Sequence, residues 1–175
     1  SLDEIIEKWQ QPLESVFPVR TKDNASEAVE ALSWKERNTK APAVKIAKPR
    51  VLIPAFPGTN CEMDSKRAFE RAGGQAHIHI IRNMTQSQLI DSIKELEVRI
   101  KESQIIMLPG GFSGGDEPDG SAKFITAVFR NPRIKEAVTD LLENRDGLML
   151  GICNGFQALI KLGLVPEGRI VDTDE

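Results

Sequence analysis

Residues 148–157, LMLGICNGFQ, contain the pattern that decides the fold. The apolar residues at its start are typical of a buried strand, and a helix is predicted from Asn154 onward. Between them, Cys153 lies at a sharp strand-to-helix turn, with Gly151 two residues before it and Gly155 two residues after it. Glycines at these positions relieve the crowding that such a turn creates. The segment therefore predicts a cysteine that projects beyond the carboxyl end of a strand.

Strands and helices alternate upstream of this turn as well. Strands are predicted at 50–56, 76–81 and 105–108, and helices at 63–72, 85–100 and in a region that ends near 144 with a break at 131–132. Alternation of this kind gives a parallel sheet with right-handed crossovers and helices on both faces. In such sheets, ligands bind beyond the carboxyl ends of the strands. The predicted fold class is therefore a doubly wound α/β sheet.

The amino-terminal part of the chain has a different character. Residues 2–9 place apolar side chains at helical spacing, and a second short helix is predicted from Asn24 or Ser26 through Trp34. Helices this short are marginal when isolated in water. We therefore expect residues 1–36 to form a short appendage, residues 37–48 a linker and residues 49–175 the sheet domain.

Composition excludes several classes of protein. The net charge of −3 comes without a basic stripe interleaved with aromatic side chains, so we expect no nucleic-acid partner. No apolar run approaches the roughly 20 residues that span a bilayer, so no membrane partner is expected. The first residues are acidic and polar, unlike a secretory signal. Two cysteines far apart in sequence favour a reducing, cytoplasmic setting over a disulfide framework.

The turn at Cys153 has the features of a nucleophile. A helix that begins behind it would point the positive end of its dipole at the sulfur, which favours the thiolate. The backbone N–H of Asn154 would lie where an oxyanion develops during acyl transfer. An isolated cysteine is more often a buried structural residue. The glycine pair and the strand-to-helix context favour the nucleophile here.

Three segments resemble the class I glutamine amidotransferases and, more narrowly, the glutaminase domain of phosphoribosylformylglycinamidine synthases. They are VLIPAFPGTNCEMD (51–64), MLPGGFSGGDEPDGSAKFI (107–125) and GICNGFQALIKLGLVP (151–166). The resemblance implies a doubly wound sheet with flavodoxin-like layering, incomplete at its carboxyl terminus. WQQPLESVFP (9–18) is similar to the end of the synthetase portion that precedes the glutaminase domain in single-chain forms, so residues 1–36 would be its tail.

The resemblance also implies roles for individual residues. Cys153 would attack the glutamine side-chain amide, release ammonia and form a glutamyl thioester. The implied oxyanion hole consists of Asn154, Gly110 and Gly111, and the implied glutamine pocket of Gly111, Phe112, Ser113 and Gln157. Members of the family carry a His and a Glu further downstream, and this sequence stops at Glu175 before they should occur. We therefore expect the chain to be inactive alone.

The parent enzyme would use glutamine and ATP to convert formylglycinamide ribonucleotide to the amidine. The expected partners of this chain are glutamine and the synthetase domain of the same polypeptide. ATP and Mg²⁺ are expected only on that synthetase part, so no cofactor and no metal are expected here. One departure from the family is Ser113-Gly114-Gly115, where many relatives have an aromatic residue, so the loop contacts are the less specific part of the match.

Other residues have simpler interpretations. His77 and His79 lie two apart on a predicted strand and face the same side, but nothing places them at Cys153, and no further ligands at metal-site spacing accompany them and Cys61. Cys61 itself lacks flanking glycines. Acidic residues at 116–119 fit a solvated loop better than a cation site.

Two rival functions follow from the same fold. One is a cysteine hydrolase or chaperone of the DJ-1/PfpI group, which shares the turn but usually pairs its cysteine with an early acidic residue. The other is a metabolite-binding module without chemistry. Gln157 favours the amidotransferase over the first rival.

Overall fold

The computed structural model describes residues 1–18, 33, 35, 41, 44–112 and 121–172. The predicted helix at 24–34 (apart from Ser33), Ser113 and the acidic residues at 116–119 lie outside these ranges. The chain divides into two compact units, Ser1–Lys40 and Ala41–Glu175. The narrower boundaries expected at residues 36 and 48 remain predictions.

The first unit contains the helix expected from the apolar spacing, α1 (Leu2–Gln10), followed by the short 3₁₀ helix η1 (Gln11–Leu13). Ser1 and Glu4 form a capping box, in which the Ser1 hydroxyl accepts from the Glu4 N–H and the Glu4 carboxylate accepts from the Ser1 amine. This arrangement satisfies donors that the first turn of a helix leaves unpaired. No side chain of α1 is buried, so its apolar stripe lies exposed.

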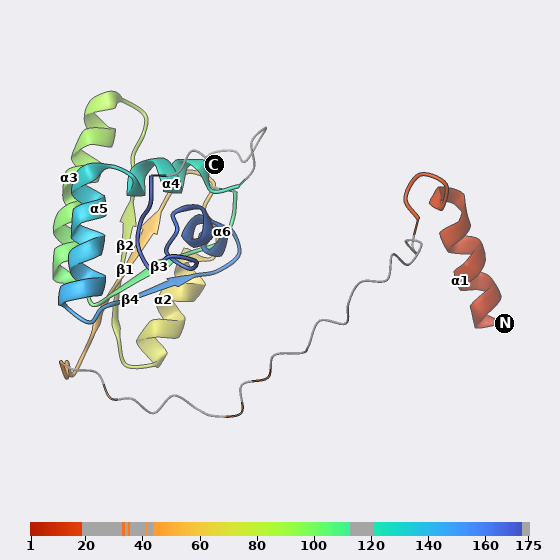
Figure 1. Ribbon diagram of the computed structural model, residues 1–175, viewed down its shortest axis with the longest axis horizontal. Helices are drawn as coiled ribbons and strands as arrows, with labels where there is room; N and C mark the ends of the chain where they lie inside the picture. Colours follow the sequence, from red (N-terminus) through yellow and green to blue (C-terminus); the bar gives the residue numbers. More distant parts are fainter. Residues whose placement is uncertain (19–32, 34, 36–40, 42–43, 113–120, 173–175) are drawn as a thin grey trace. The chain divides into compact units, whose positions relative to one another are not determined.

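The second unit is built on a parallel sheet, as predicted (Figure 1). Its strands are β1 (Arg50–Ala55), β2 (Gln75–Ile80), β3 (Ile105–Leu108) and β4 (Leu148–Gly151), in the order β2-β1-β3-β4. This is the flavodoxin-like order over the described strands. The order reverses between β1 and β3, and the carboxyl ends of these two strands therefore flank the crevice where doubly wound folds bind ligands.

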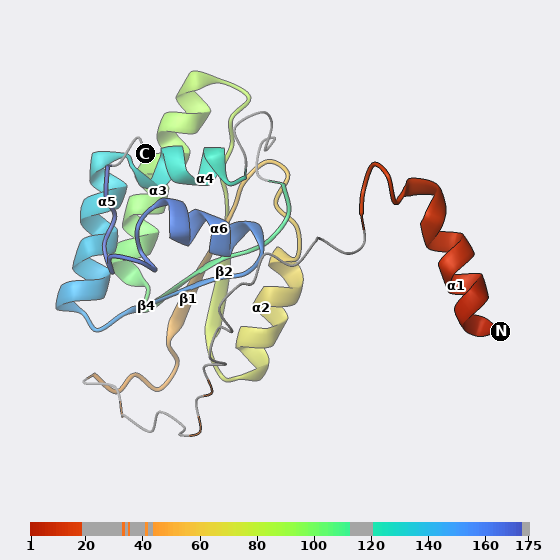
Figure 2. The same ribbon diagram turned by 45° about the vertical axis from the view of Figure 1, so that its right-hand side comes forward.

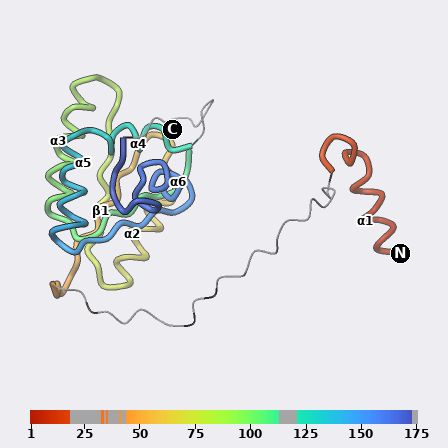
Figure 3. Tube along the Cα trace, viewed as in Figure 1, coloured from red at the N-terminus to blue at the C-terminus, as the bar shows by residue number. Residues whose placement is uncertain are grey.

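Helices cover both faces of the sheet (Figures 1 and 2). One face packs against α2 (Glu62–Arg71), whose Phe69 joins a small core with Val51, Ile53 and Met107. The other face carries the larger core, under α3 (Gln86–Glu102), α4 (Lys123–Phe129), α5 (Pro132–Thr139), the π-helical turn η2 (Asp140–Asn144) and α6 (Asn154–Lys161). Helices α3 and α5 run side by side (Figure 3).

Short sequence signals set the ends of these helices. The Thr85 hydroxyl accepts a hydrogen bond from the Gln88 N–H and begins α3. The Asn131 side chain accepts from the Arg133 N–H, with Pro132 at the first helical position of α5, which confirms the break predicted at 131–132. Within the described part of the chain, no helix is long and apolar enough to cross a membrane.

Candidate functional site: a cysteine elbow at the sheet edge

Cys153 lies in a strained turn between β4 and α6. Its backbone has φ 54° and ψ −112°, a conformation that non-glycine residues rarely adopt. The turn is held by hydrogen bonds from the Ile152 N–H to the Leu108 carbonyl and from the Gly155 N–H to the Ile152 carbonyl, at 3.1 and 2.9 Å. The Cys153 residue is exposed. A strained turn that exposes the nucleophile at the end of a strand is the geometry of a nucleophile elbow.

The two glycines around Cys153 allow α6 to pack directly on the sheet. A Cβ at Gly155 would overlap the backbone carbonyl group of Leu108 in β3, and a Cβ at Gly151 would lie 2.5 Å from the Gly155 carbonyl oxygen. Backbone therefore touches backbone at this point, and no side chain can be accommodated. This close backbone contact fixes the position of the first turn of α6, and with it Cys153, relative to the sheet.

The loop after β3 lies against the cysteine. A Cβ at Gly110 would lie 3.3 Å from the Cβ of Cys153 and 4.0 Å from its sulfur. Asn154, the residue after the cysteine, is buried, with 1% of its surface exposed. The sheet therefore brings Gly110 next to the Cys153–Asn154 pair, although helices α4 and α5 and strand β4 lie between them in the chain.

The remaining predicted pocket residues lie at the same edge. Gly111 adopts φ 112°, and Phe112 beside it is 73% exposed. Gln157 is exposed one turn along α6, and its N–H donates to the Cys153 carbonyl at 3.0 Å. The geometry of Ser113 lies outside the described residues.

A second loop, residues 57–60 after β1, pairs with the loop after β3. Thr59 and Gly111 form an antiparallel bridge. The Asn60 N–H donates to the Gly110 carbonyl at 2.8 Å, and the Phe112 N–H donates to the Gly58 carbonyl at 2.9 Å. The sequence patterns described above assign no functional role to residues 57–60. The feature that could have indicated a contact with the loop after β3 is that these residues follow β1, the strand at which the sheet order reverses.

Cys61 follows this loop at the start of α2. It also has a positive φ, 67°, and is exposed, but no glycine flanks it and its side chain caps no helix N–H. Its carbonyl accepts from the Ser65 hydroxyl at 2.7 Å. Nothing in this geometry distinguishes Cys61 as a nucleophile.

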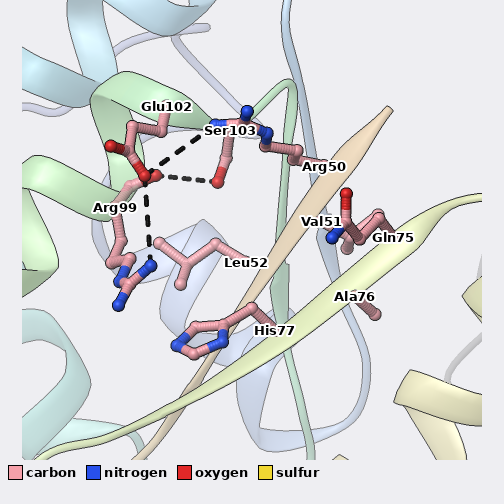
Figure 4. Close-up of a pocket in the computed structure, with 9 residues that line it drawn as sticks. All are labelled: Arg50, Val51, Leu52, Gln75, Ala76, His77, Arg99, Glu102 and Ser103. Atoms are coloured by element: carbon pink, nitrogen blue, oxygen red, sulfur yellow. Dashed lines mark hydrogen bonds and ion pairs between the residues drawn. The ribbon is translucent and has the colours of Figure 1, made fainter. Parts of the chain in front are cut away.

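Both histidines of the chain lie on β2, at the opposite side of the sheet from β4. His79 is buried and its Nε2 donates to the Ser92 carbonyl at 2.9 Å. His77 lines a pocket of about 230 Å³, where its ring lies near Arg99 (Figure 4). Desolvation, followed by the charge of Arg99, lowers the pKa of His77. Strands β1 and β3 separate both side chains from Cys153, so neither serves as its base.

No group of three or more potential ligands among the described residues could hold a metal ion. The chemistry that the elbow supports is acyl transfer to a thiol, with backbone N–H groups as oxyanion donors.

Comparisons with known proteins agree with this geometry. The family model of the CobB/CobQ-like glutamine amidotransferase domain matches residues 48–175. A phosphoribosylformylglycinamidine synthase subunit PurQ from Dehalococcoides mccartyi is 36% identical over 121 residues, which are 69% of this chain and 43% of the relative. The PurQ subunit from Methanococcus maripaludis is 37% identical over 117 residues, 66% of this chain and 38% of the relative.

A solved structure of PurLQS from Thermotoga maritima is also similar, with 29% identity and a TM-score of 0.47 over 67% of this chain and 45% of that one. The chain thus spans less than half the length of the curated relatives that it matches. The family match extends over the whole sheet unit, including both loops and the cysteine elbow. The chain belongs to the CobB/CobQ-like glutamine amidotransferase domain family.

Proposed function

We propose that this chain carries the nucleophile half of the glutaminase site of a phosphoribosylformylglycinamidine synthase. The observation that carries the proposal is the Cys153 elbow, which has Gly110 next to it and is followed by the buried Asn154. The similarity to PurQ subunits supports the purine-pathway assignment over the other amidotransferases.

The proposed reaction begins with attack of the Cys153 thiolate on the side-chain amide carbon of glutamine. The carbonyl oxygen becomes an oxyanion that accepts hydrogen bonds from backbone N–H groups of Asn154 and of the Gly110–Gly111 segment. The C–N bond then breaks, ammonia leaves with an added proton, and a γ-glutamyl thioester remains on the sulfur. Water hydrolyses the thioester to glutamate and regenerates the thiol.

Departing ammonia must take up a proton, and neither histidine of this chain is placed to donate it. Both of its histidines lie on β2, away from the elbow. General acid–base assistance is typically worth about 10²–10⁴-fold. We therefore expect slow turnover, with a thioester that lasts long enough to be detected, until a histidine oriented by a carboxylate is supplied from elsewhere.

The ammonia would be consumed by a synthetase that uses ATP and Mg²⁺ to amidate formylglycinamide ribonucleotide. Glutamine and this synthetase are the proposed partners, and the nucleotide and metal would bind to the synthetase. Support for a synthetase partner comes from the similar PurQ proteins, which are themselves subunits of phosphoribosylformylglycinamidine synthase.

The test is intact-protein mass spectrometry after incubation with glutamine. We expect an adduct of one γ-glutamyl group that maps to Cys153 and that hydroxylamine releases as the hydroxamate. Cys153→Ala should remove the adduct, whereas Cys61→Ala, the matched control at the other exposed cysteine, should retain it.

Iodoacetamide labelling provides an independent measure of the thiol. We expect faster alkylation of Cys153 than of Cys61 at neutral pH, because only Cys153 lies at the elbow. An adduct on Cys61, or no adduct on either cysteine, would contradict the proposed function. Free imidazole should raise the rate of glutamine hydrolysis. An unchanged rate would contradict the view that the chain lacks a base.

A further inference from the structure

The loop that follows β1 has no role in the function proposed above, although it contacts the segment expected to stabilise the oxyanion. Its Thr59 faces Gly111 in an antiparallel bridge, flanked by hydrogen bonds from Asn60 to Gly110 and from Phe112 to Gly58. These bonds join two loops that are separated in the chain by two helices and two strands. They lie at the crevice where the strand order reverses.

The pattern of these bonds determines how the peptide between Gly110 and Gly111 is turned. The two flanking bonds leave Thr59 and Gly111 as a non-hydrogen-bonded pair, in which the N–H and C=O of each residue point away from the partner segment. The Gly110 carbonyl points toward Asn60, because it accepts that residue's N–H at 2.8 Å. In a planar trans peptide, the Gly111 N–H must then point in the opposite direction.

The cysteine lies beside the same peptide. A Cβ at Gly110 would lie 3.3 Å from the Cβ of Cys153 and 4.0 Å from its sulfur. The 57–60 loop is therefore hydrogen-bonded to the segment that neighbours Cys153.

Thr59 in turn stabilises the 57–60 loop, which pairs with residues 110–112. Its hydroxyl accepts a hydrogen bond from the Phe56 N–H, and its own N–H donates to the Phe56 carbonyl, both at 2.9 Å. The loop is therefore closed on the end of β1 through one side chain. Gly111 is adapted to the pairing, because a Cβ there would meet the Gly58 carbonyl and lie 2.6 Å from the Asn60 nitrogen.

We propose that Thr59 is a positioning residue for the acyl-transfer step. By holding the 57–60 loop, whose Asn60 N–H binds the Gly110 carbonyl, it sets the orientation of the Gly110–Gly111 peptide beside Cys153. The inference rests on the proposed function, since it assigns Thr59 to the same acyl-transfer step. It makes a claim of its own, namely that the 57–60 loop determines how well this peptide stabilises the oxyanion.

The test compares two reactions of Cys153 in the 175-residue chain. In acylation by p-nitrophenyl acetate, the thiolate attacks the ester carbonyl, an oxyanion forms, the C–O bond breaks and p-nitrophenolate leaves as an anion, so no proton donor is required. Alkylation by iodoacetamide displaces iodide and forms no oxyanion. Peptide mapping separates the Cys153 adducts from those of Cys61.

The informative variant is Thr59→Val, which keeps the shape of the side chain and removes the acceptor for the Phe56 N–H. We expect the ratio of the acylation rate to the alkylation rate to fall about tenfold, which is less than the roughly 10²–10³-fold that loss of a whole oxyanion donor costs, because the donor is misplaced and not removed. Thr59→Ser, the matched control that retains the hydroxyl, should keep the ratio of the unaltered chain. Gly111→Ala, which forces the loops apart, should lower the ratio at least as far as Thr59→Val.

An unchanged ratio in Thr59→Val would overturn the proposal. A parallel fall of both rates would overturn it too, because Thr59 would then support only the fold. These outcomes are distinct from a failure of the proposed function: a chain that forms no γ-glutamyl adduct from glutamine but shows the expected ratios would retain the positioning role and lose the glutaminase assignment.

Discussion

At the scale of single residues, the site depends on positions where a side chain is excluded. Gly155 is the clearest case, because the first turn of α6 rests on the Leu108 carbonyl group with no room for a Cβ. Cys153, two residues earlier, keeps a strained backbone that the surrounding contacts must hold in place. A change at Gly155 should therefore affect both stability and the orientation of the Cys153 side chain.

We predict that Gly155→Ala lowers the free energy of unfolding by about 1–3 kcal/mol, the usual cost of overpacking a tight contact. Urea denaturation measures this change, and iodoacetamide labelling of Cys153 reports whether the elbow moves. Gly168→Ala is the control: Gly168 has φ 70° and open space around it, so it carries the backbone strain without the steric overlap. Labelling should slow in Gly155→Ala alone, and equal effects of the two variants on labelling would contradict the packing explanation.

At the scale of elements, the end of α3 depends on one distant side chain. The last carbonyls of a helix have no partner within it. Arg145 supplies donors to three carbonyls at this end, with its guanidinium 2.9–3.0 Å from the oxygens of Ile100, Lys101 and Ser103. Its Nε donates to Asp140 at 2.7 Å, which joins η2 to the same cluster. The planar guanidinium suits this set of acceptors in a way that a lysine ammonium does not.

We predict that Arg145→Ala destabilises the second unit by about 1–3 kcal/mol, since the Lys101 and Ser103 carbonyls lose this donor together, whereas the Ile100 carbonyl still accepts from the Ser103 N–H. Arg145→Lys should recover only part of this loss. Arg133→Ala is the control, because Arg133 forms an exposed ion pair with Glu97 at 3.6 Å and such pairs contribute at most about 1 kcal/mol. Urea denaturation of the three variants makes the comparison, and equal losses at positions 145 and 133 would refute the role of Arg145.

The same cluster predicts a dependence on pH. Hydrogen bonds from Asn144 and Arg145 lower the pKa of Asp140 from its ordinary value of 3.8. A carboxylate whose pKa is depressed in the folded state stabilises the fold above its unfolded pKa, and this contribution is lost as the pH falls through the folded pKa. We therefore expect the stability difference between the unaltered chain and Asp140→Asn to be constant near neutrality and to shrink below about pH 4. Denaturation midpoints across an acid pH series measure it, and a difference that stays constant through that range would count against the ionised cluster.

At the scale of the second unit, no helix among the described residues covers one part of the sheet. Helix α2 packs on β1 and β2, and in the described chain β4 pairs only with β3. Leu148 and Leu150 alternate along β4 toward the α2 side and are 62% and 44% exposed. The apolar surface continues into a pocket of about 440 Å³ that includes Val44 and Ile46. Exposed apolar faces and strand edges favour association.

We predict that the chain self-associates in a concentration-dependent manner, and that Leu148→Lys combined with Leu150→Lys shifts it toward the monomer. Sedimentation velocity over a concentration series measures both effects. Val98→Lys is the control, because Val98 is comparably exposed on α3 and lies on the other face of the sheet. A monomer at every concentration in the unaltered chain would refute the prediction, as would an equal effect of the Val98 substitution.

Much of the site could be predicted from the sequence because its signals are local. The alternation of strands and helices, the start of a helix at Thr85, the break at 131–132 and the glycines around Cys153 each depend on a few neighbouring residues. The structure agrees with all of them. The roles assigned to Cys153, Asn154, Gly110, Gly111, Phe112, Ser113 and Gln157 remain proposals, although the described members of this set meet at one edge of the sheet.

The sequence by itself determined the class of the sheet, the family and the candidate nucleophile. Hydrophobic periodicity, helix capping and turn residues are the signals for these, and each depends on residues close together in the chain. Only the tertiary structure decided that His79 is buried against Ser92, that Leu148 and Leu150 of β4 are exposed and that Thr59 lies opposite Gly111. The physical reason is that these features depend on strand order and on hydrogen bonds between segments distant in the chain. Such pairings exist only once β3 has been placed between β1 and β4.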